Sequence, residues 1–463
     1  MKDFQKALSD FKNISCYCII NTQKVSDMMY REISKLILYK PETTCILSNF
    51  SDITRKFDSN QYDKANLTEL IYQSVKDLLD LSTLYGFDQN LWQCYLTYYM
   101  MMHENSFTLV SEKNPASNGS VNFFALNDYQ VFYRLFHYDF QPLEHALDIN
   151  VFSILTNYTA MAKKERMYNK NVSDKVLEVR NLLKDAQNEQ EFFTIMTNFY
   201  ARFGVGMFGL NKAFRIQSDD YGNVTFLPIN NMDQVTLNDL VGYEWQKEAL
   251  KENTRAFCTS GKANNVLLYG DAGTGKSTSI KAIVNEFYED GLRMIEIYKH
   301  QFKDLSQIIA KIKNRNYRYI IYMDDLSFEE FEIEYKFLKA VIEGGVETRP
   351  DNILIYATSN RRHLIRETWG DRSDMSQDEL HHSDTIAEKL SLVARFGLSI
   401  PFEKPNQKNY QQIVIELAKR YPEITLSEEE LIKEARKWEI AHGGMSGRAA
   451  QQLINHLAGK SVL

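Results

Sequence analysis

The stretch that decides the fold is residues 266–277, which read VLLYGDAGTGKS. Four residues of strand character come first, and residues 270–277 match the pattern G-x-x-x-x-G-K-[ST] of a phosphate-binding loop. Residues 280–288 then have the pattern of a helix. Because the motif lies between a strand and a helix, the sequence predicts a nucleoside-triphosphate site on an α/β fold.

The residue types within this loop suit phosphate binding. Its glycines let successive backbone N–H groups point toward a β-phosphate, and the following helix adds its positive amino end. Lys276 supplies a mobile charge for the β- and γ-phosphates, and the Ser277 hydroxyl is a ligand for Mg²⁺. We therefore expect ATP and Mg²⁺ to bind here. The loop residues expected to bind them are Gly270, Asp271, Ala272, Gly273, Thr274, Gly275, Lys276, Ser277 and Thr278.

Length and composition set the context of this site. A chain of 463 residues exceeds what one core accommodates and predicts two or three domains. Hydrophobic residues make up 44% and charged residues 25%, which is typical of a soluble globular protein. The net charge of −7 argues against a chain-wide basic field for nucleic acid or an anionic membrane, and leaves room for a local basic groove.

The cysteines and the amino-terminal residues predict a cytoplasmic protein. The five cysteines are scattered and odd in number, which fits a reducing compartment better than a disulfide framework. Cys16 and Cys18 could form half of a metal site, but no matching pair completes it, so buried thiols are favoured. Charges in residues 1–6 interrupt a signal-peptide core, and no apolar run approaches the ~18 residues of a membrane helix.

Residues 1–210 are expected to form a mostly helical domain of unknown role. Apolar residues recur there at spacings of three and four in four stretches, namely 25–38, 67–81, 176–183 and 191–200. His103, His137 and His145 lie among aromatic residues and are expected to pack in the core. The abundance of Tyr and Phe is interpreted first as core, with an interaction surface as the alternative.

The next segment changes character. Residues 211–239 are expected to form a β-hairpin, with a turn that contains Gly222, followed by a linker. The nucleotide-binding domain is expected at residues 240–403 and opens with Leu240-Val241-Gly242-Tyr243. In ATPases with such a Gly-aromatic segment it packs beside the adenine, and a simple lead-in to the next helix is the alternative.

Two acidic residues follow a strand at 319–323, which is apolar throughout, as a strand buried on both faces must be. An acidic residue at the carboxyl end of a strand beside the phosphate loop holds Mg²⁺ and its waters, and we assign this role to Asp324. Asp325 is placed to polarise the attacking water. Glu is the commoner base, because its extra methylene reaches further, so Glu329 and Glu330 are the alternatives.

A further strand at 353–357 ends in a polar run, from which Asn360 is expected to orient the water against the γ-phosphate. The basic residues 361–363 are interpreted as a solvated helix start, with a partner or nucleic-acid contact as the alternative. The two histidines at 381–382 lie in an acidic stretch without identifiable further metal ligands.

Two arginines complete the candidate site. Arg395 precedes the last strand, at 398–400, and is expected to project from the edge of the subunit. Residues 404–463 are expected to form a small helical lid with a capping box at 427–430. Arg448, at the start of the final helix, can face the nucleotide.

These motifs, in this order, resemble the AAA+ ATPase superfamily. Within it, residues 225–463 resemble the uncharacterised bacterial family DUF815, and the stretches that carry the resemblance are 263–270, 324–329, 357–364 and 446–448. The run ATSNRRHL at 357–364 is the most specific of them. The resemblance implies a multidomain α and α/β chain, in which a helical N-terminal domain precedes a P-loop AAA+ domain with a central parallel sheet and a helical lid.

The resemblance also implies roles for single residues. It makes Lys276 and Ser277 the Walker A pair, Asp324 and Asp325 the Walker B pair, Asn360 sensor 1, Arg395 an arginine finger and Arg448 sensor 2. An acidic residue is expected before the finger in this family, and Ala394 stands there instead.

Two functions of different class follow. The first is an oligomeric ATPase, a ring or open ring of identical subunits, in which Arg395 reaches the neighbour's γ-phosphate and hydrolysis remodels or loads a macromolecular client. The second is an ATP-dependent binding switch with little or no hydrolysis, motivated by the short Asp325. A loader that hands a protein to nucleic acid lies between them, and a small-molecule kinase is third. The negative charge favours a protein client over nucleic acid, and no membrane partner is expected.

Overall fold

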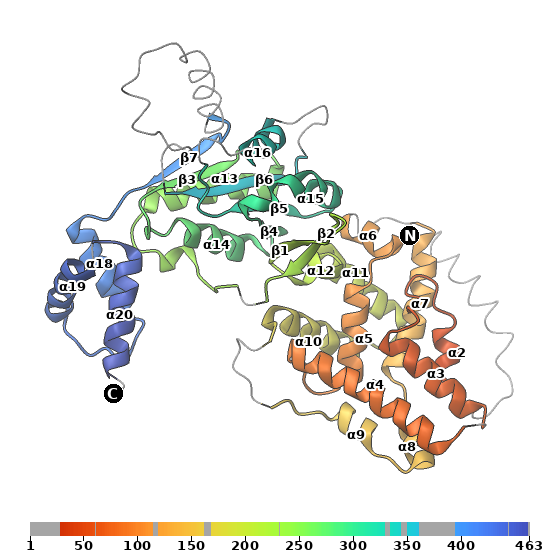
Figure 1. Ribbon diagram of the computed structural model, residues 1–463. Coiled ribbons are helices and arrows are strands. Elements are labelled where there is room, and N and C mark those ends of the chain that lie inside the picture. The colour runs from red at the N-terminus through yellow and green to blue at the C-terminus, as the bar shows by residue number, and fades with distance from the viewer. Residues whose placement is uncertain are drawn as a thin grey trace.

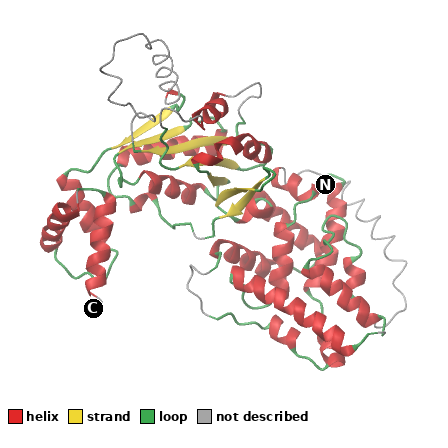
Figure 2. Ribbon diagram, viewed as in Figure 1, coloured by secondary structure: helices red, strands yellow, loops and turns green. Residues whose placement is uncertain are grey.

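The computed structural model describes residues 28–60, 62–113, 119–161, 168–230, 232–328, 334–343, 350–360, 394–442 and 444–461. A helical region comes first in the chain, an α/β domain follows, and a small group of helices ends it. Figure 1 shows the helical region and the terminal helices on opposite sides of the α/β domain, and Figure 2 shows the strands gathered in that middle domain. The predicted fold class is confirmed.

The helical region is built around aromatic side chains such as Tyr39, Phe50 and Trp92, which are buried in one hydrophobic cluster. The helices expected around residues 67–81, 176–183 and 191–200 are confirmed. The helices of the region are α2 (Met29–Ile33), α3 (Ile46–Asp58), α4 (Lys64–Tyr85), α5 (Leu91–Met102), α6 (Ser106–Lys113), α7 (Val121–Phe136), α8 (Gln141–Leu147), α9 (Val151–Thr156), α10 (Lys170–Asp185), α11 (Glu189–Phe203) and α12 (Gly206–Leu210). None of the described helices is long and apolar enough to span a membrane.

Two local predictions in this region are wrong. The helix predicted over 25–38 stops at Ile33, because the fully buried Asp128 carboxylate accepts the backbone N–H groups of residues 37–39 at 2.7–3.1 Å and holds them in a turn. Of the three histidines expected in the core, only His103 is partly buried. His137 and His145 are exposed, the first at the C-cap of α7 and the second on the outer side of α8.

The central sheet has seven strands in the order β2-β1-β4-β5-β6-β3-β7. The predicted hairpin is confirmed, with Gly222 in its turn at φ +79°, but it is also part of this sheet, because β1 pairs in parallel with β4. The strands are β1 (Ala213–Ser218), β2 (Val224–Pro228), β3 (Val266–Gly270), β4 (Leu292–Glu296), β5 (Arg318–Met323), β6 (Ile353–Ser359) and β7 (Leu398–Phe402).

Helices cover both faces of the sheet. Helices α15 (Leu305–Ile312) and α16 (Glu334–Glu343) pack in the cluster on one face, and α13 (Glu244–Ser260) and α14 (Lys276–Phe287) in that on the other. Two short 3₁₀ turns, η3 (Leu237–Asp239) and η4 (Lys299–Asp304), adjoin them. The terminal group consists of α18 (Gln407–Ala418), α19 (Glu428–His442) and α20 (Gly447–Ser461), which share a separate core. The predicted capping box is present, since Ser427 and Glu430 exchange hydrogen bonds before α19.

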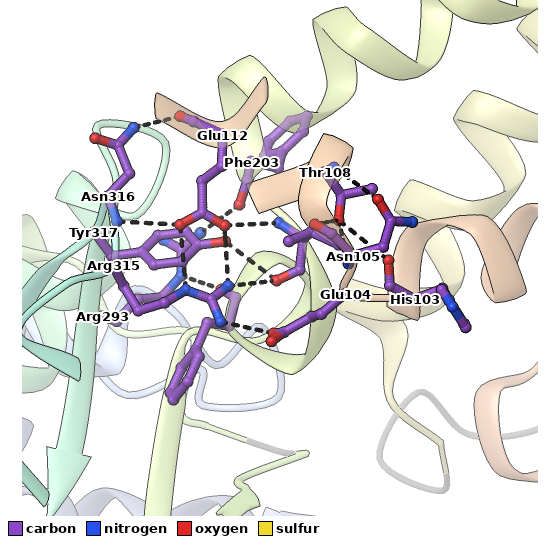
Figure 3. Close-up of polar contacts among 12 residues, drawn as sticks. His103, Glu104, Asn105, Thr108, Glu112, Phe203, Arg293, Arg315, Asn316 and Tyr317 are labelled. Carbon is purple, nitrogen blue, oxygen red and sulfur yellow. Dashed lines mark hydrogen bonds and ion pairs between the residues drawn. The ribbon is translucent and has the colours of Figure 1, made fainter. Parts of the chain in front are cut away.

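A buried polar network joins the helical region to the α/β domain (Figure 3). The Glu112 carboxylate of α6 is 2% exposed, and the Arg315 guanidinium donates to it at 2.9 Å. The backbone N–H groups of Asn316 and Val205 donate to the same carboxylate at 3.1 and 3.3 Å. Arg315 and Asn316 belong to the turn before β5, so this network lies at the amino end of that strand.

A second buried cation strengthens this junction. Arg293 of β4 is fully buried, and its guanidinium donates to the carbonyls of Phe203, Phe208 and Tyr288 at 3.2, 2.5 and 3.0 Å. Two of these carbonyls lie at the carboxyl ends of α11 and α14, where a positive charge is favoured. Gly204 adopts φ +81°, and a Cβ there would lie 1.6 Å from the Tyr317 hydroxyl, so glycine is required for this packing.

Candidate nucleotide-binding site

A cavity of about 640 Å³ lies at the carboxyl ends of the central strands, between the α/β domain and the terminal helices. Its lining comes from distant parts of the chain. The lining residues are Asp239, Leu240, Val241, Tyr243, Ala272, Gly273, Thr274, Gly275, Lys276, Ser277, Thr278, Asp324, Asp325, Thr358, Asn360, Ile413, Leu417, Gly447, Arg448 and Gln451.

The predicted phosphate loop connects β3 to α14. Seven of its nine predicted residues line the cavity, from Ala272 to Thr278. Gly270 and Asp271 instead contact β7: a Cβ on Gly270 would lie 2.2 Å from the Phe402 carbonyl oxygen, and the Asp271 carboxylate accepts the backbone N–H of Lys404 at 2.9 Å. These two residues therefore anchor the loop to the edge of the sheet.

Lys276 is the first residue of α14, and its ammonium group lies across the loop. It donates to the carbonyls of Gly270 and Asp271 at 2.9 and 2.6 Å and to the Asn360 side-chain oxygen at 3.0 Å. Burial lowers the pKa of Lys276, and the carboxylates of Asp271, Asp325 and Asp324 oppose that effect. The phosphate loop and the polar residue after β6 are thus in direct contact.

A cluster of hydroxyl and carboxylate groups surrounds Asp324. The Ser277 hydroxyl donates to Asp324 Oδ1 at 2.7 Å, and the Thr358 hydroxyl donates to the same oxygen at 2.6 Å. Burial raises the pKa of Asp324, but these hydrogen bonds outweigh it and leave the pKa below its usual value. Ser277 and Asp324, both predicted as Mg²⁺ ligands, therefore lie together as hard oxygen donors of the kind that Mg²⁺ prefers.

Asp325 lies on the other side of this cluster. Its carboxylate accepts a hydrogen bond from the Asn360 side-chain amide at 2.6 Å. Asn360 therefore bridges Lys276 and Asp325, since its oxygen accepts from the first and its nitrogen donates to the second. The residues predicted to polarise and to orient an attacking water are in contact.

The two predicted arginines lie in different places. Arg448 lines the cavity at the start of α20, and its backbone N–H donates to the Gly273 carbonyl at 3.2 Å. Arg395 precedes β7, which runs parallel to β3, so Arg395 lies at the amino edge of the sheet, opposite the phosphate loop. It is not among the residues that line the cavity of its own subunit.

Several lining residues carried no recognised role in the sequence. Thr358 was part of a polar run, but nothing in the sequence singled it out. Ile413, Leu417 and Gln451 are ordinary helix positions whose direction depends on how α18 and α20 pack. Leu240, Val241 and Tyr243 of the Gly-aromatic segment do line the same cavity, and the Tyr243 ring stacks on Phe402 with centroids 5.1 Å apart.

Some sequence predictions fall on residues outside those that the structure describes. These are the possible half-site at Cys16 and Cys18, the alternative bases Glu329 and Glu330, the basic residues 361–363 and the histidines 381–382.

Fold and site together define a P-loop α/β domain with a helical lid, which is the architecture of AAA+ ATPases. The chain belongs to the family described as "Protein of unknown function (DUF815)", which matches residues 210–461 and so more than half of the chain. No curated protein sequence gives a significant match.

Solved structures of RuvB from Thermotoga maritima, a Holliday junction branch migration motor, align with part of the chain. One is 16% identical with a TM-score of 0.34, covers 48% of this chain and 63% of RuvB, and two substituted forms give 15% and 17% identity with TM-scores of 0.33 and 0.34. The matched part spans less than two thirds of the RuvB chains.

Proposed function

We propose that this protein is an AAA+ type ATPase that binds Mg²⁺–ATP in the cavity and couples hydrolysis to remodelling or loading of a macromolecular client. The observation that carries the proposal is the convergence of four separate segments on one cavity. They contribute Lys276 with Ser277, the Asp324–Asp325 pair, Asn360, and Arg448 of the lid. Each is a type of group that γ-phosphate transfer requires.

In the proposed reaction, a water oxygen attacks the γ-phosphorus, the bond to the β–γ bridging oxygen breaks, and the Asp325 carboxylate takes the proton of the water. Asn360 orients that water, and Lys276 balances charge on the β- and γ-oxygens. Ser277 and Asp324 would hold Mg²⁺, which neutralises phosphate charge when bound. In the described part of the chain no group of three or more His, Cys, Asp or Glu could hold a metal. Mg²⁺ usually completes its shell with substrate phosphates and waters.

We further propose that the ATPase works as a homo-oligomer. Because Arg395 and the phosphate loop lie at opposite edges of the sheet, Arg395 is placed away from its own subunit's γ-phosphate, and we assign it to a neighbour's. The helical region is the proposed site of client binding, and the net charge of −7 favours a protein client over nucleic acid.

The direct test is steady-state ATP hydrolysis measured across protein concentration, with Asp325→Asn as the control. We expect specific activity to rise with concentration, as an intersubunit site requires, and to vanish in the variant. Activity that does not depend on concentration would contradict the shared site.

A second candidate function is an ATP-dependent binding switch with little or no hydrolysis. Asp325 is a shorter base than the usual Glu, and one oxygen of its carboxylate already accepts a hydrogen bond from the Asn360 amide at 2.6 Å. Tight ATP binding without turnover at any protein concentration would favour this alternative over the ATPase.

A further inference from the structure

Thr358 is the second-to-last residue of β6, at the end of the strand that borders the cavity. It lies in β6, where it pairs with Leu268 of β3, and it is 2% exposed. It therefore stands between the strand that carries the phosphate loop and β5, the strand that ends in the two aspartates. Its side chain reaches the cavity, but no sequence motif assigns it a role.

The Thr358 hydroxyl both donates and accepts a hydrogen bond. It donates to Asp324 Oδ1 at 2.6 Å, and it accepts the backbone N–H of Asp325 at 2.9 Å. The Thr358 carbonyl in turn accepts the backbone N–H of Leu326 at 2.7 Å. One residue thus holds three successive residues at the end of β5.

The backbone held in this way has an unusual conformation. Asp325 adopts φ +51°, in the left-handed region that few residues other than glycine occupy, at a typical cost of about 1–3 kcal/mol. Successive side chains of an extended strand point to opposite faces, so a regular continuation of β5 would turn Asp324 and Asp325 away from each other. Because the chain bends at Asp325, both carboxylates line the same cavity.

We propose that Thr358 is a positioning residue, whose hydroxyl fixes the rotamer of Asp324 and the bent backbone of Asp325 and so places both carboxylates for the reaction. The inference rests on the proposed ATPase function. Valine has the shape of threonine without the hydroxyl, so Thr358→Val removes both hydrogen bonds with little change in volume. Serine keeps the hydroxyl, so Thr358→Ser should retain the positioning.

The test compares these two variants with the wild-type chain in two measurements. In steady-state hydrolysis, Thr358→Val should lower kcat about 10–100-fold, the usual effect of removing a group that orients a metal ligand, with little change in KM, while Thr358→Ser stays near wild type. In calorimetry with ATPγS, Thr358→Val should raise the Mg²⁺ concentration needed for half-maximal binding about 10-fold and leave binding in EDTA unchanged.

Thr254→Val is the matched control. Thr254 is also fully buried in the α/β domain, and its hydroxyl bonds to the Leu250 carbonyl and to the Tyr356 hydroxyl of β6, both at 2.8 Å and neither among the residues that line the cavity. This variant should leave kcat and the Mg²⁺ dependence unchanged. If Thr358→Val does not fold, Thr358→Ala serves the same test.

Three outcomes would overturn the proposal: wild-type kcat and Mg²⁺ dependence in Thr358→Val, equal losses in Thr358→Ser and Thr358→Val, or a parallel loss of binding with and without Mg²⁺, which indicates general damage. If the wild-type chain itself hydrolyses no ATP, the proposed function fails instead. The Mg²⁺ dependence of ATPγS binding then still tests Thr358.

Discussion

Polar groups lie at both ends of strand β5, but those at the carboxyl end line a cavity and those at the amino end join two domains. At the carboxyl end, Asp324 and Asp325 line a cavity, and their hydrogen-bond partners include Ser277 and Asn360. In the proposed function, a nucleotide and a metal replace these bonds. At the amino end, Arg315 bonds to the buried Glu112, within the protein interior. Six residues, or ~20 Å of strand, separate the two clusters.

The groups at the carboxyl end of β5 are therefore assigned to function, and those at the amino end to holding the domains together. Hydrogen bonds that a ligand can replace keep binding groups in place until the ligand arrives, whereas bonds that nothing replaces fix one domain against another. A buried charge that loses its partner is costly, so the cluster around Glu112 holds the helical region to the sheet. The comparison predicts that changes at the carboxyl end alter turnover and that changes at the amino end alter stability.

The largest effect is expected at Arg395. An arginine supplied to the γ-phosphate is typically worth ~10³–10⁵ in rate, so Arg395→Ala should reduce ATP turnover by that factor, with ATP affinity and thermal stability nearly unchanged. Arg255→Ala, at an exposed position on α13, is the control and should keep full activity.

Mixing experiments make this prediction sharper. Arg395→Ala and Asp325→Asn subunits are each expected to be inactive alone. If the arginine acts in trans, a mixture of the two forms some sites with an intact Asp325 and an intact neighbouring Arg395, and turnover returns. Mixtures that stay inactive, or an Arg395→Ala variant with normal turnover, would refute the shared site.

A smaller effect, on stability, is expected at the other end of β5. Glu112→Gln removes the buried carboxylate of the Arg315–Glu112 pair and leaves Arg315 with only the more exposed Glu104, so it should lower the free energy of unfolding by about 3 kcal/mol, measured by urea denaturation. Asp58→Asn breaks the more exposed Arg31–Asp58 pair and should change the urea midpoint little.

Nucleotide binding should be independent of that change. ATP at 100 times its dissociation constant should stabilise the wild type and Glu112→Gln equally, by about 2.7 kcal/mol. Unequal stabilisation would mean that the two ends of the strand are coupled, and the separation of function from assembly would be wrong.

The nucleotide site could be predicted from the sequence because each of its groups lies in a short motif. Residues 270–277 match a motif for a ligand of fixed shape, so the chemistry dictates the spacing, and Asp324 and Asn360 follow strands whose ends must meet at one edge of the sheet. Thr358 was missed because its role depends on the bend at Asp325, and no residue type near Asp325 predicts that bend.

The junction could not be predicted, because its contacts join residues far apart in the chain. Glu112 and Arg315 are separated by about two hundred positions, and each alone is an ordinary charged residue. The hairpin was predicted from its turn, but its place in the sheet depends on β4, which lies some eighty residues further on. In the same way, Asp128 ends the helix predicted over 25–38 through contacts that periodicity does not contain.

The smallest expected effect is a pH dependence of stability that arises in the helical region and not at the cavity. His103 packs between the rings of Tyr39 and Tyr99, and burial lowers its pKa, although Glu42 and Asp128 oppose the shift. Below the unfolded pKa of about 6.5, the unfolded chain binds a proton more readily than the folded one. Stability should therefore be highest above pH 6.5 and decline as the pH falls through the folded pKa.

His103→Phe keeps the aromatic packing and should flatten this decline in the melting temperature between about pH 7 and pH 5. His145→Gln, at an exposed position on α8, should leave the decline in place. An unchanged slope in His103→Phe would assign the pH dependence to other groups. Because His103 lies in the helical region, the variant should also leave the pH profile of ATP turnover unaltered, and a shift in that profile would show that this region and the cavity are linked.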